Sequence, residues 1–281
     1  MDRRLAIHHE PNTAQPLALA VYVHPFAEEM NKSRRMAALA AQRLAAAGCA
    51  VLQLDLLGCG DSSGDFGDAT WAQWREDVLA GVGWLRKRHA HCSNAAPTWL
   101  WGLRAGCLLA AEAAPLLSGV VNLLFWQPPT SGKALLQQFL RLRTASEMLT
   151  GADKGGSAAL RQRIDAGQSI DVAGYTLHPE LCRGLERASL RQPSPPSAGT
   201  GRVEWIELRM QPSSALTPLA QQLAGPWREA GWALRQQLLV GPAFWQTTEI
   251  EDAPALLCAT VAAVLAPITA AMPGEQAGAL T

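Results

Sequence analysis

The chain has 281 residues, and a chain of about 300 residues can bury roughly 75% of the surface that its unfolded form exposes. Hydrophobic residues make up 48% of it and charged residues 17%, which excludes an intrinsically disordered protein. Lys plus Arg and Asp plus Glu each number 24, so the formal net charge is zero. Such a chain has no general electrostatic attraction to nucleic acid or to an anionic membrane, and we expect a globular protein without a nucleic-acid partner.

The cysteines and the apolar runs exclude further classes. Six cysteines occur singly, with no CxxC pair and no histidine at zinc-ligand spacing, so neither a metal nor a cofactor is expected. The apolar stretch from Leu5 to Ile7 is too short for the hydrophobic part of a signal peptide. Pro254 and Pro267 bracket the longest uncharged helix, which would span roughly 18 Å of a ~30 Å hydrocarbon core. We expect no membrane insertion and a cytoplasmic location.

Strands and helices alternate over the first 126 residues. Short apolar runs rich in β-formers predict four strands, at 17–23, 50–56, 97–101 and 120–126. Apolar residues that recur at three and four positions predict the helices between them, at 34–47 with Ser33 as N-cap, at 69–88 and from 105 to about 115. This alternation predicts right-handed βαβ units, and hence an α/β fold with a mostly parallel, doubly wound sheet and helices on both faces.

The alternation stops at Gln127-Pro128-Pro129. Two helices, an extended segment and a linker rich in Pro, Ser and Gly are predicted next, at 134–148, from Pro179, at 169–177 and at 192–201. The alternation then resumes with a strand, a helix, a strand and a helix, at 203–210, 215–230, 233–240 and 255–266. We therefore predict a core in two parts, 1–126 and 202–281, with an inserted lid at 127–201.

The turn after the third predicted strand has the layout of a nucleophile elbow. In open parallel sheets, ligands bind at the carboxyl ends of the strands. The run Gly102-Leu103-Arg104-Ala105-Gly106 follows such an end, and its glycines permit the tight turn that lifts the central side chain above the sheet. The central residue is Arg104, which cannot act as a nucleophile.

Several segments together resemble the α/β-hydrolase superfamily and, more narrowly, its exosortase A system-associated hydrolase 2 group. They read HPFAEEMNKSRR at 24–35, DLLGCGDSSGDF at 55–66, GLRAG at 102–106 and FWQ at 244–246, and the resemblance extends over nearly the whole chain. It implies the α/β-hydrolase fold with an inserted lid and classification as a hydrolase. It also implies a Gram-negative bacterial source with exopolysaccharide and exosortase pathway proteins as partners, and an oxyanion hole at the backbone of Phe26 and Ala105.

The three catalytic positions of that superfamily are vacant in this sequence. A triad runs in the chain order Ser, Asp or Glu, His. Arg104 takes the nucleophile position, and the loop 211–217 contains no carboxylate. The last histidine is His178, so Phe244-Trp245-Gln246 replaces the general base after the final predicted strand. Ordinary serine esterase activity is therefore not expected.

Arg104 is the first candidate site residue. A guanidinium at the first turn of a helix lies beside free backbone N–H groups and the positive end of the helix dipole, and a bound anion would relieve that repulsion. The alternative is an ion pair that fixes the loops. Its partner would be one of four carboxylates, those of Glu28, Glu29, Asp55 and Asp61.

The other candidates also follow strand ends. His24 could act as a general base near Glu28 or Glu29, or its ring could simply hydrogen-bond the loop. Cys59, Ser62 and Cys107 are more typical of packing and turn residues than of a replacement nucleophile. The ligand site is expected to include Phe26, Asp55, Asp61, Ser62, Ala105 and Trp245.

Two functions remain open at this point. One is a hydrolase with altered machinery, in which Arg104 polarises an activated ester, thioester or acyl phosphate, His24 and a Glu act as base, and water attacks. The other is a non-catalytic protein that binds an anionic ligand or a protein partner. A small molecule with an acyl part is the expected ligand, although the apolar lid helix with Leu135 and Phe139 could instead form a homodimer interface.

Overall fold

The structure is a computed structural model that describes residues 3–90, 96–129, 131–150, 156–213 and 215–267, without the side chains of 142–150 and 157. Seven strands form one sheet in the order β1-β3-β2-β4-β5-β8-β9. Their bounds are β1 Ala6–His9, β2 Ala18–Val23, β3 Cys49–Leu54, β4 Thr98–Leu103, β5 Val121–Trp126, β8 Arg202–Arg209 and β9 Ala233–Val240. All neighbouring strands pair in parallel except β1, which runs antiparallel to β3. The predicted mostly parallel sheet is confirmed.

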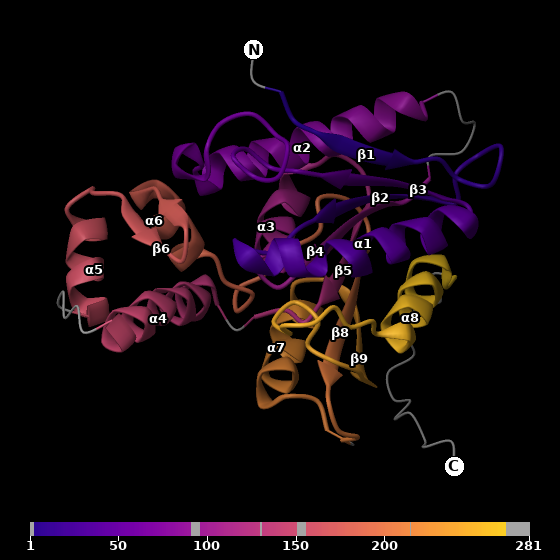
Figure 1. Cartoon of the computed structure of the whole chain (residues 1–281). Coiled ribbons are helices and arrows are strands. Elements are labelled where there is room, and N and C mark those ends of the chain that lie inside the picture. Colours follow the sequence, from indigo (N-terminus) through magenta and orange to yellow (C-terminus); the bar gives the residue numbers. More distant parts are fainter. Residues whose placement is uncertain (1–2, 91–95, 130, 151–155, 214, 268–281) are drawn as a thin grey trace.

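Helices cover both faces of this sheet, as predicted (Figure 1). Helices α1 (Glu28–Ala46) and α8 (Pro254–Leu265) pack against one face, and α2 (Trp71–Arg88), α3 (Ala105–Ala113) and α7 (Pro218–Glu229) pack against the other. Successive strand residues point to opposite faces, so β2 sends Val21 and Val23 into one hydrophobic core and Ala20 and Tyr22 into the second. Two short 3₁₀ helices complete the core elements, at Phe66–Asp68 and Ala114–Leu116.

The structure differs from the sequence prediction at two places near the N-terminus. Strand β1 was not predicted because it is a four-residue edge strand with partly exposed side chains and no continuous apolar run. Helix α1 begins at Glu28, so Ser33 is not its N-cap. Ser33 is buried within the helix, and its hydroxyl donates to the carbonyl of Met30 at 3.1 Å. The chain turns sharply at Ala27, which has φ of 50° and lies four residues after the end of β2, and the helix begins at that turn.

The chain between β5 and β8 forms a separate group of elements beside the sheet (Figure 1). They are α4 Gly132–Thr150, α5 Gly156–Asp165, β6 Ile170–Val172, β7 Tyr175–Leu177 and α6 Pro179–Arg187. Helix α6 lies close against α2, because a Cβ at Gly184 would stand 2.1 Å from the Cβ of Trp71. The predicted extended segment is thus the hairpin β6–β7, and the glycines of 151–155 lie outside the described residues. Whether this segment acts as a lid stays a prediction.

Among the helices of the described residues, none has both the length and the apolar character that crossing a bilayer requires.

Candidate functional site at the elbow

The turn between β4 and α3 has the tight geometry that the sequence predicts. Arg104 precedes α3 with φ of 53° and ψ of −116°, a strained conformation for a residue with a side chain. The two flanking glycines are required by close packing. A Cβ at Gly106 would stand 2.0 Å from the carbonyl oxygen of Val23, and one at Gly102 would stand 2.5 Å from the backbone nitrogen of Cys107. The elbow therefore fixes the start of α3 directly against the end of β2.

The side chain of Arg104 is held by three partners from three parts of the fold. Its Nε donates to Oε1 of Glu29 on α1 at 3.2 Å, and its Nη2 donates to Oε1 of Gln138 on α4 at 3.4 Å. Its guanidinium carbon lies 6.0 Å from the ring centroid of Trp245, which follows β9. The Arg104 and Glu29 side chains are only 12% and 20% exposed. Of the four carboxylates considered for an ion pair, Glu29 is the partner.

Glu29 has an environment that opposes its ionisation. Burial raises the pKa of Glu29 above its ordinary value, and this effect exceeds the opposing influence of the Arg104 charge and of the Gln246 side chain. The carboxyl group thus takes up a proton at a higher pH than an exposed glutamate does. A protonated Glu29 would no longer balance the charge of Arg104.

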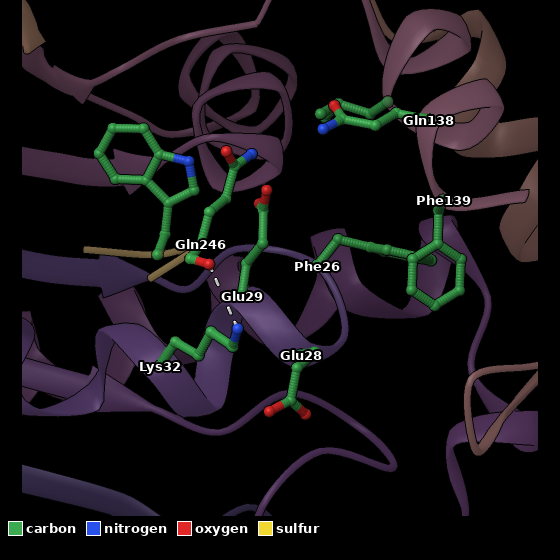
Figure 2. A pocket seen from close by; sticks show the side chains of 9 residues that line it. Phe26, Glu28, Glu29, Lys32, Gln138, Phe139 and Gln246 are labelled. Atoms are coloured by element: carbon green, nitrogen blue, oxygen red, sulfur yellow. Dashed lines mark hydrogen bonds between the residues drawn. The ribbon is translucent and has the colours of Figure 1, made fainter. Parts of the chain in front are cut away.

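A pocket of about 310 Å³ opens beside this ion pair (Figure 2). Its apolar walls come from Phe26, from Leu135 and Phe139 on α4, and from Trp245. Its polar side chains are those of Glu28, Glu29, Lys32, Gln138 and Gln246. The Nζ of Lys32 donates to the carbonyl of Gln246 at 3.3 Å, the bond drawn dashed in Figure 2. The core and the inserted segment therefore both contribute to one mixed pocket.

Arg104 itself lines a second hollow, of about 300 Å³, on the other side of α4 residues Leu135 and Gln138. These two residues line both spaces, so the guanidinium lies at the boundary between them. The second hollow includes Glu207 near the carboxyl end of β8 and Thr217, the N-cap of α7. The two spaces share a wall at the elbow.

Three of the residues predicted for the catalytic or ligand site, namely Phe26, Trp245 and Glu28, line the first pocket. Phe26 is buried, and its ring meets the ring of Phe139 edge to face at a centroid distance of 5.2 Å. Trp245 is also buried. Glu28 is exposed at the rim, where its Oε2 accepts hydrogen bonds from the Tyr175 hydroxyl at 3.0 Å and from the Asn31 amide at 3.1 Å. Together with Arg104 at the boundary, these residues form the part of the predicted site that the fold brings together.

His24 lies outside this pocket. It lines a separate hollow of about 240 Å³ beneath β1 and α1. With the proton assigned to Nδ1, that nitrogen donates to the carbonyl of Pro25 at 2.8 Å, and Nε2 accepts from the backbone N–H of Leu56 at 3.3 Å. Burial lowers the pKa of His24, so the neutral ring is favoured. Both nitrogens are engaged with the backbone, which is the loop-bonding alternative rather than the arrangement of a general base with Glu28.

The loop that carries Asp55, Asp61 and Ser62 is bonded to its own surroundings. The Asp55 carboxylate pairs with Arg34 of α1 at 3.3 Å and accepts from the Asp61 backbone N–H at 3.2 Å. The Ser62 hydroxyl donates to the carbonyl of Asp55 at 2.5 Å and accepts from the backbone N–H of Leu5 at 2.9 Å. In the described part of the chain, these three residues do not line the first pocket. They were expected there only because their loop follows a parallel strand.

The remaining candidates are backbone groups and thiols. Ala105 is the first residue of α3 and is buried, so its N–H belongs to the unpaired start of a helix. Cys107 is fully buried, and its thiol contacts the carbonyl of Gly102 at 3.2 Å. Burial raises the pKa of Cys107 and raises that of Cys59 to about 12. Neither thiol is therefore activated as a nucleophile.

Sequence reasoning missed the polar lining that comes from helix interiors and strand ends. Gln138 belongs to no motif, and Lys32 and Gln246 lie in segments that carry the resemblance but were not assigned to the site. Only the packing of α4 and α1 around the elbow brings the three together. Glu207 was missed because it precedes the loop that was searched for an acid. It is buried, and its carboxylate accepts from the Thr217 hydroxyl at 2.7 Å and from the Trp205 indole at 3.2 Å. Its neighbours indicate that it holds the start of α7.

No protein-family model and no curated protein sequence matches this chain. Solved structures do match it. Est1E from Butyrivibrio proteoclasticus, bound to ferulic acid, aligns with a TM-score of 0.64 and 15% identity over 94% of this chain and 93% of the other. A thermostable carboxyl esterase from Bacillus coagulans aligns with a TM-score of 0.55 and 13% identity over 85% and 86%. A proline iminopeptidase from Mycobacterium smegmatis aligns with a TM-score of 0.53 and 16% identity over 94% of both chains. At these identities the likeness is one of fold, and the chain has the α/β-hydrolase fold.

Proposed function

We propose that the elbow pocket binds a small ligand that has an anionic head and an apolar acyl or aromatic part. One observation carries this proposal. Arg104 stands where the sequence resemblance places a nucleophile, and its side chain, only 12% exposed, lies at the boundary of a pocket whose walls include Phe26, Leu135 and Phe139. An acyl chain could lie against the apolar walls while its carboxylate meets the cation.

Binding of an anion would proceed by exchange of partners. Arg104 is already paired with Glu29, so an incoming carboxylate has to replace that carboxylate. The raised pKa of Glu29 makes this exchange easier, because Glu29 can take up a proton and leave the cation to the ligand. Lys32 adds a second positive charge to the pocket, and Glu28 at the rim opposes it. Anion affinity is therefore expected to rise as the pH falls toward the pKa of Glu29.

Hydrolysis of an activated acyl compound is the second candidate function. It is favoured by the position of Arg104 beside the unpaired N–H groups at the start of α3, since such donors stabilise a developing oxyanion. Water would be the attacking group, and Glu29, rather than His24, is the titratable group near enough to Arg104 to assist it. The sequence lacks the Ser-Asp-His triad, which supports slow turnover at most and makes binding the first candidate.

The finer assignments rest on the sequence resemblance. We propose a cytoplasmic protein of bacteria that acts with exosortase A or exopolysaccharide pathway proteins, and we keep a homodimer through the inserted segment as a further prediction. Deletion of the gene in its host, with secreted exopolysaccharide measured before and after complementation, tests the pathway. Complementation by Arg104→Ala asks whether the elbow matters to it, and light scattering of the purified chain tests the dimer.

Calorimetric titration separates the two functions. Octanoate and octanol have the same chain length, so the difference between their affinities measures the contribution of the anionic head. We expect wild type to bind octanoate more tightly, and Arg104→Ala to lose about tenfold or more, which is ~1.4 kcal/mol, for octanoate alone. Equal affinity for both compounds in both proteins would contradict the proposal. A parallel panel of p-nitrophenyl esters, thioesters and acyl phosphates reports turnover, and turnover that Arg104→Ala removes would make hydrolysis the first candidate.

A further inference from the structure

Two histidines and a glutamate lie close together where the edge strand β1 meets the C-terminal end of α2. His8 lies on β1, Glu10 follows that strand, and His89 is the C-cap of α2. The Nε2 atoms of the two histidines are 3.3 Å apart, and Nδ1 of His8 is 3.4 Å from Oε1 of Glu10. Each of the three side chains offers a ligand atom that lies within 4.8 Å of the other two. His8 and His89 are 81 residues apart in the sequence, so no local spacing announces the cluster.

The spacing of the two imidazoles suits a bridging metal ion. A tetrahedral zinc ion about 2.0–2.1 Å from each of two nitrogens holds those nitrogens about 3.3–3.4 Å apart. The ring centroids are 5.3 Å apart with an angle of 59° between the planes, so the rings converge from different directions instead of stacking. A proton shared between the two Nε2 atoms fits the same gap, and the zinc titration below distinguishes the two occupants.

The surroundings of the cluster support a positive ion there. The C-terminal end of α2, where His89 lies, carries the negative end of the helix dipole. His8 is fixed by pairing with Leu52 of β3, and Trp84 of α2 meets its ring edge to face at 5.3 Å. One group opposes the cation. Arg88 donates to Oε1 of Glu10 at 2.8 Å and would have to release that carboxylate.

We propose that His8, His89 and Glu10 bind a divalent cation of the zinc class, with Nε2 of each imidazole as a ligand. The exposed Glu10 carboxylate turns away from Nδ1 of His8 and from Arg88 to become the third ligand, and a fourth position is left to water. Zinc fits this donor set because it accepts nitrogen and oxygen ligands in tetrahedral geometry. The site would join the edge strand β1 to the C-terminal end of α2. Helix α2 runs from the carboxyl end of β3 to the amino end of β4. Its C-terminal end, and with it the site, therefore lies near the amino ends of the parallel strands, whereas the elbow lies at their carboxyl ends. Its role would thus be structural.

Zinc titration of the full chain tests this site. The protein is stripped with a chelator and titrated with Zn²⁺ in competition with a chromophoric chelator. Wild type is expected to bind a single ion, and His8→Gln and His89→Gln are each expected to weaken binding by about tenfold or more. His9→Gln is the matched control, because His9 is the next residue on β1 and bonds instead to Gln53 at 2.8 Å. It should bind zinc as wild type does.

Two further measurements make the assignment specific. Arg88→Gln is expected to tighten zinc binding several-fold, because it releases Glu10 from its competing ion pair, whereas Glu10→Gln should weaken it. Co²⁺ bound in place of Zn²⁺ should give the intense visible absorption of a four-coordinate ion. Far-UV circular dichroism of each variant confirms that it is folded. Absence of zinc binding by wild type, or equal binding by wild type and the folded His8→Gln and His89→Gln variants, would overturn the proposal.

Discussion

Two arginine–carboxylate pairs involve helix α1, and only one of them borders the pocket at the elbow. Arg104 at the elbow pairs with Glu29 of α1, and Arg34 of α1 pairs with Asp55 at the end of β3. The elbow pair is 12% and 20% exposed and borders side chains of α4. In the other pair Arg34 is 45% exposed, and its partner Asp55 is bonded to its own loop. Position at a strand end was therefore not enough to predict the site. The difference between the two strand ends is that α4 packs over the elbow and encloses a pocket there.

The largest expected effect is a loss of stability on replacing a glycine of the elbow, which has less space for a side chain than the glycine in the loop of Asp55. Gly106→Ala would place a Cβ 2.0 Å from a backbone oxygen of β2, which cannot move without shifting the sheet. Gly60→Ala, in the loop of Asp55, would meet the side chains of Asp55 and Arg34, which can rotate, and would keep a φ of 55° at a cost of about 1 kcal/mol. We expect Gly106→Ala to lose about 3 kcal/mol or more of unfolding free energy and Gly60→Ala about half of that or less. Urea unfolding measures both, and similar losses would contradict the comparison.

A second prediction concerns Ser62, which the sequence offered as a ligand residue. Its hydroxyl joins the carbonyl of Asp55 to the N–H of Leu5, so Ser62→Ala leaves two backbone groups without their partner. We expect a loss of about 2 kcal/mol in unfolding free energy and no change in octanoate binding. Ser63→Ala is the matched control, since Ser63 bonds to the backbone of Arg3 in an exposed setting and should cost less. A change in octanoate affinity in Ser62→Ala would mean that this loop contributes to ligand binding.

The third prediction uses the titration of Glu29. Its pKa is raised in the folded protein, so between the ordinary value and the raised value the folded state binds more protons than the unfolded state. Stability must then fall as the pH rises through that interval. Glu29→Gln lacks this group, so wild type should lose stability relative to Glu29→Gln as the pH rises above the ordinary glutamate range. Thermal unfolding of both proteins at a series of pH values measures the difference, and a difference that is constant with pH would contradict the raised pKa.

Glu29→Gln also tests whether an anionic ligand replaces the Glu29 carboxylate at Arg104. Without the Glu29 carboxylate, Arg104 is open to an anionic ligand at every pH. Octanoate affinity should therefore be higher in Glu29→Gln than in wild type near neutral pH, and it should depend less on pH. An unchanged pH dependence would contradict the assignment of this titration to Glu29.

Local patterns predicted most of the fold and only part of the site. Apolar runs and helical periodicity located the parallel strands and their helices, because those signals arise within one element. The elbow was recognisable from its two glycines for the same reason. The short edge strand β1 and the early start of α1 carried no such signal. Glu29 was only one of four possible partners of Arg104 and Gln138 was not considered, because their meeting at Arg104 depends on how α4 and α1 pack around the elbow.

The smallest expected effect is that of removing the second ion pair. Arg34 is 45% exposed, and exposed ion pairs contribute about 0–1 kcal/mol because water screens the charges. Asp55 keeps its hydrogen bond from the Asp61 N–H, so Arg34→Gln leaves no buried charge without a partner. We expect less than about 1 kcal/mol of lost unfolding free energy and unchanged octanoate affinity. The matched variant Arg104→Gln leaves Glu29, which is only 20% exposed, without its cation, and should lose both stability and octanoate binding. Equal losses in the two variants would mean that enclosure by α4 does not distinguish the two pairs, and the elbow would then be no more a binding site than the loop.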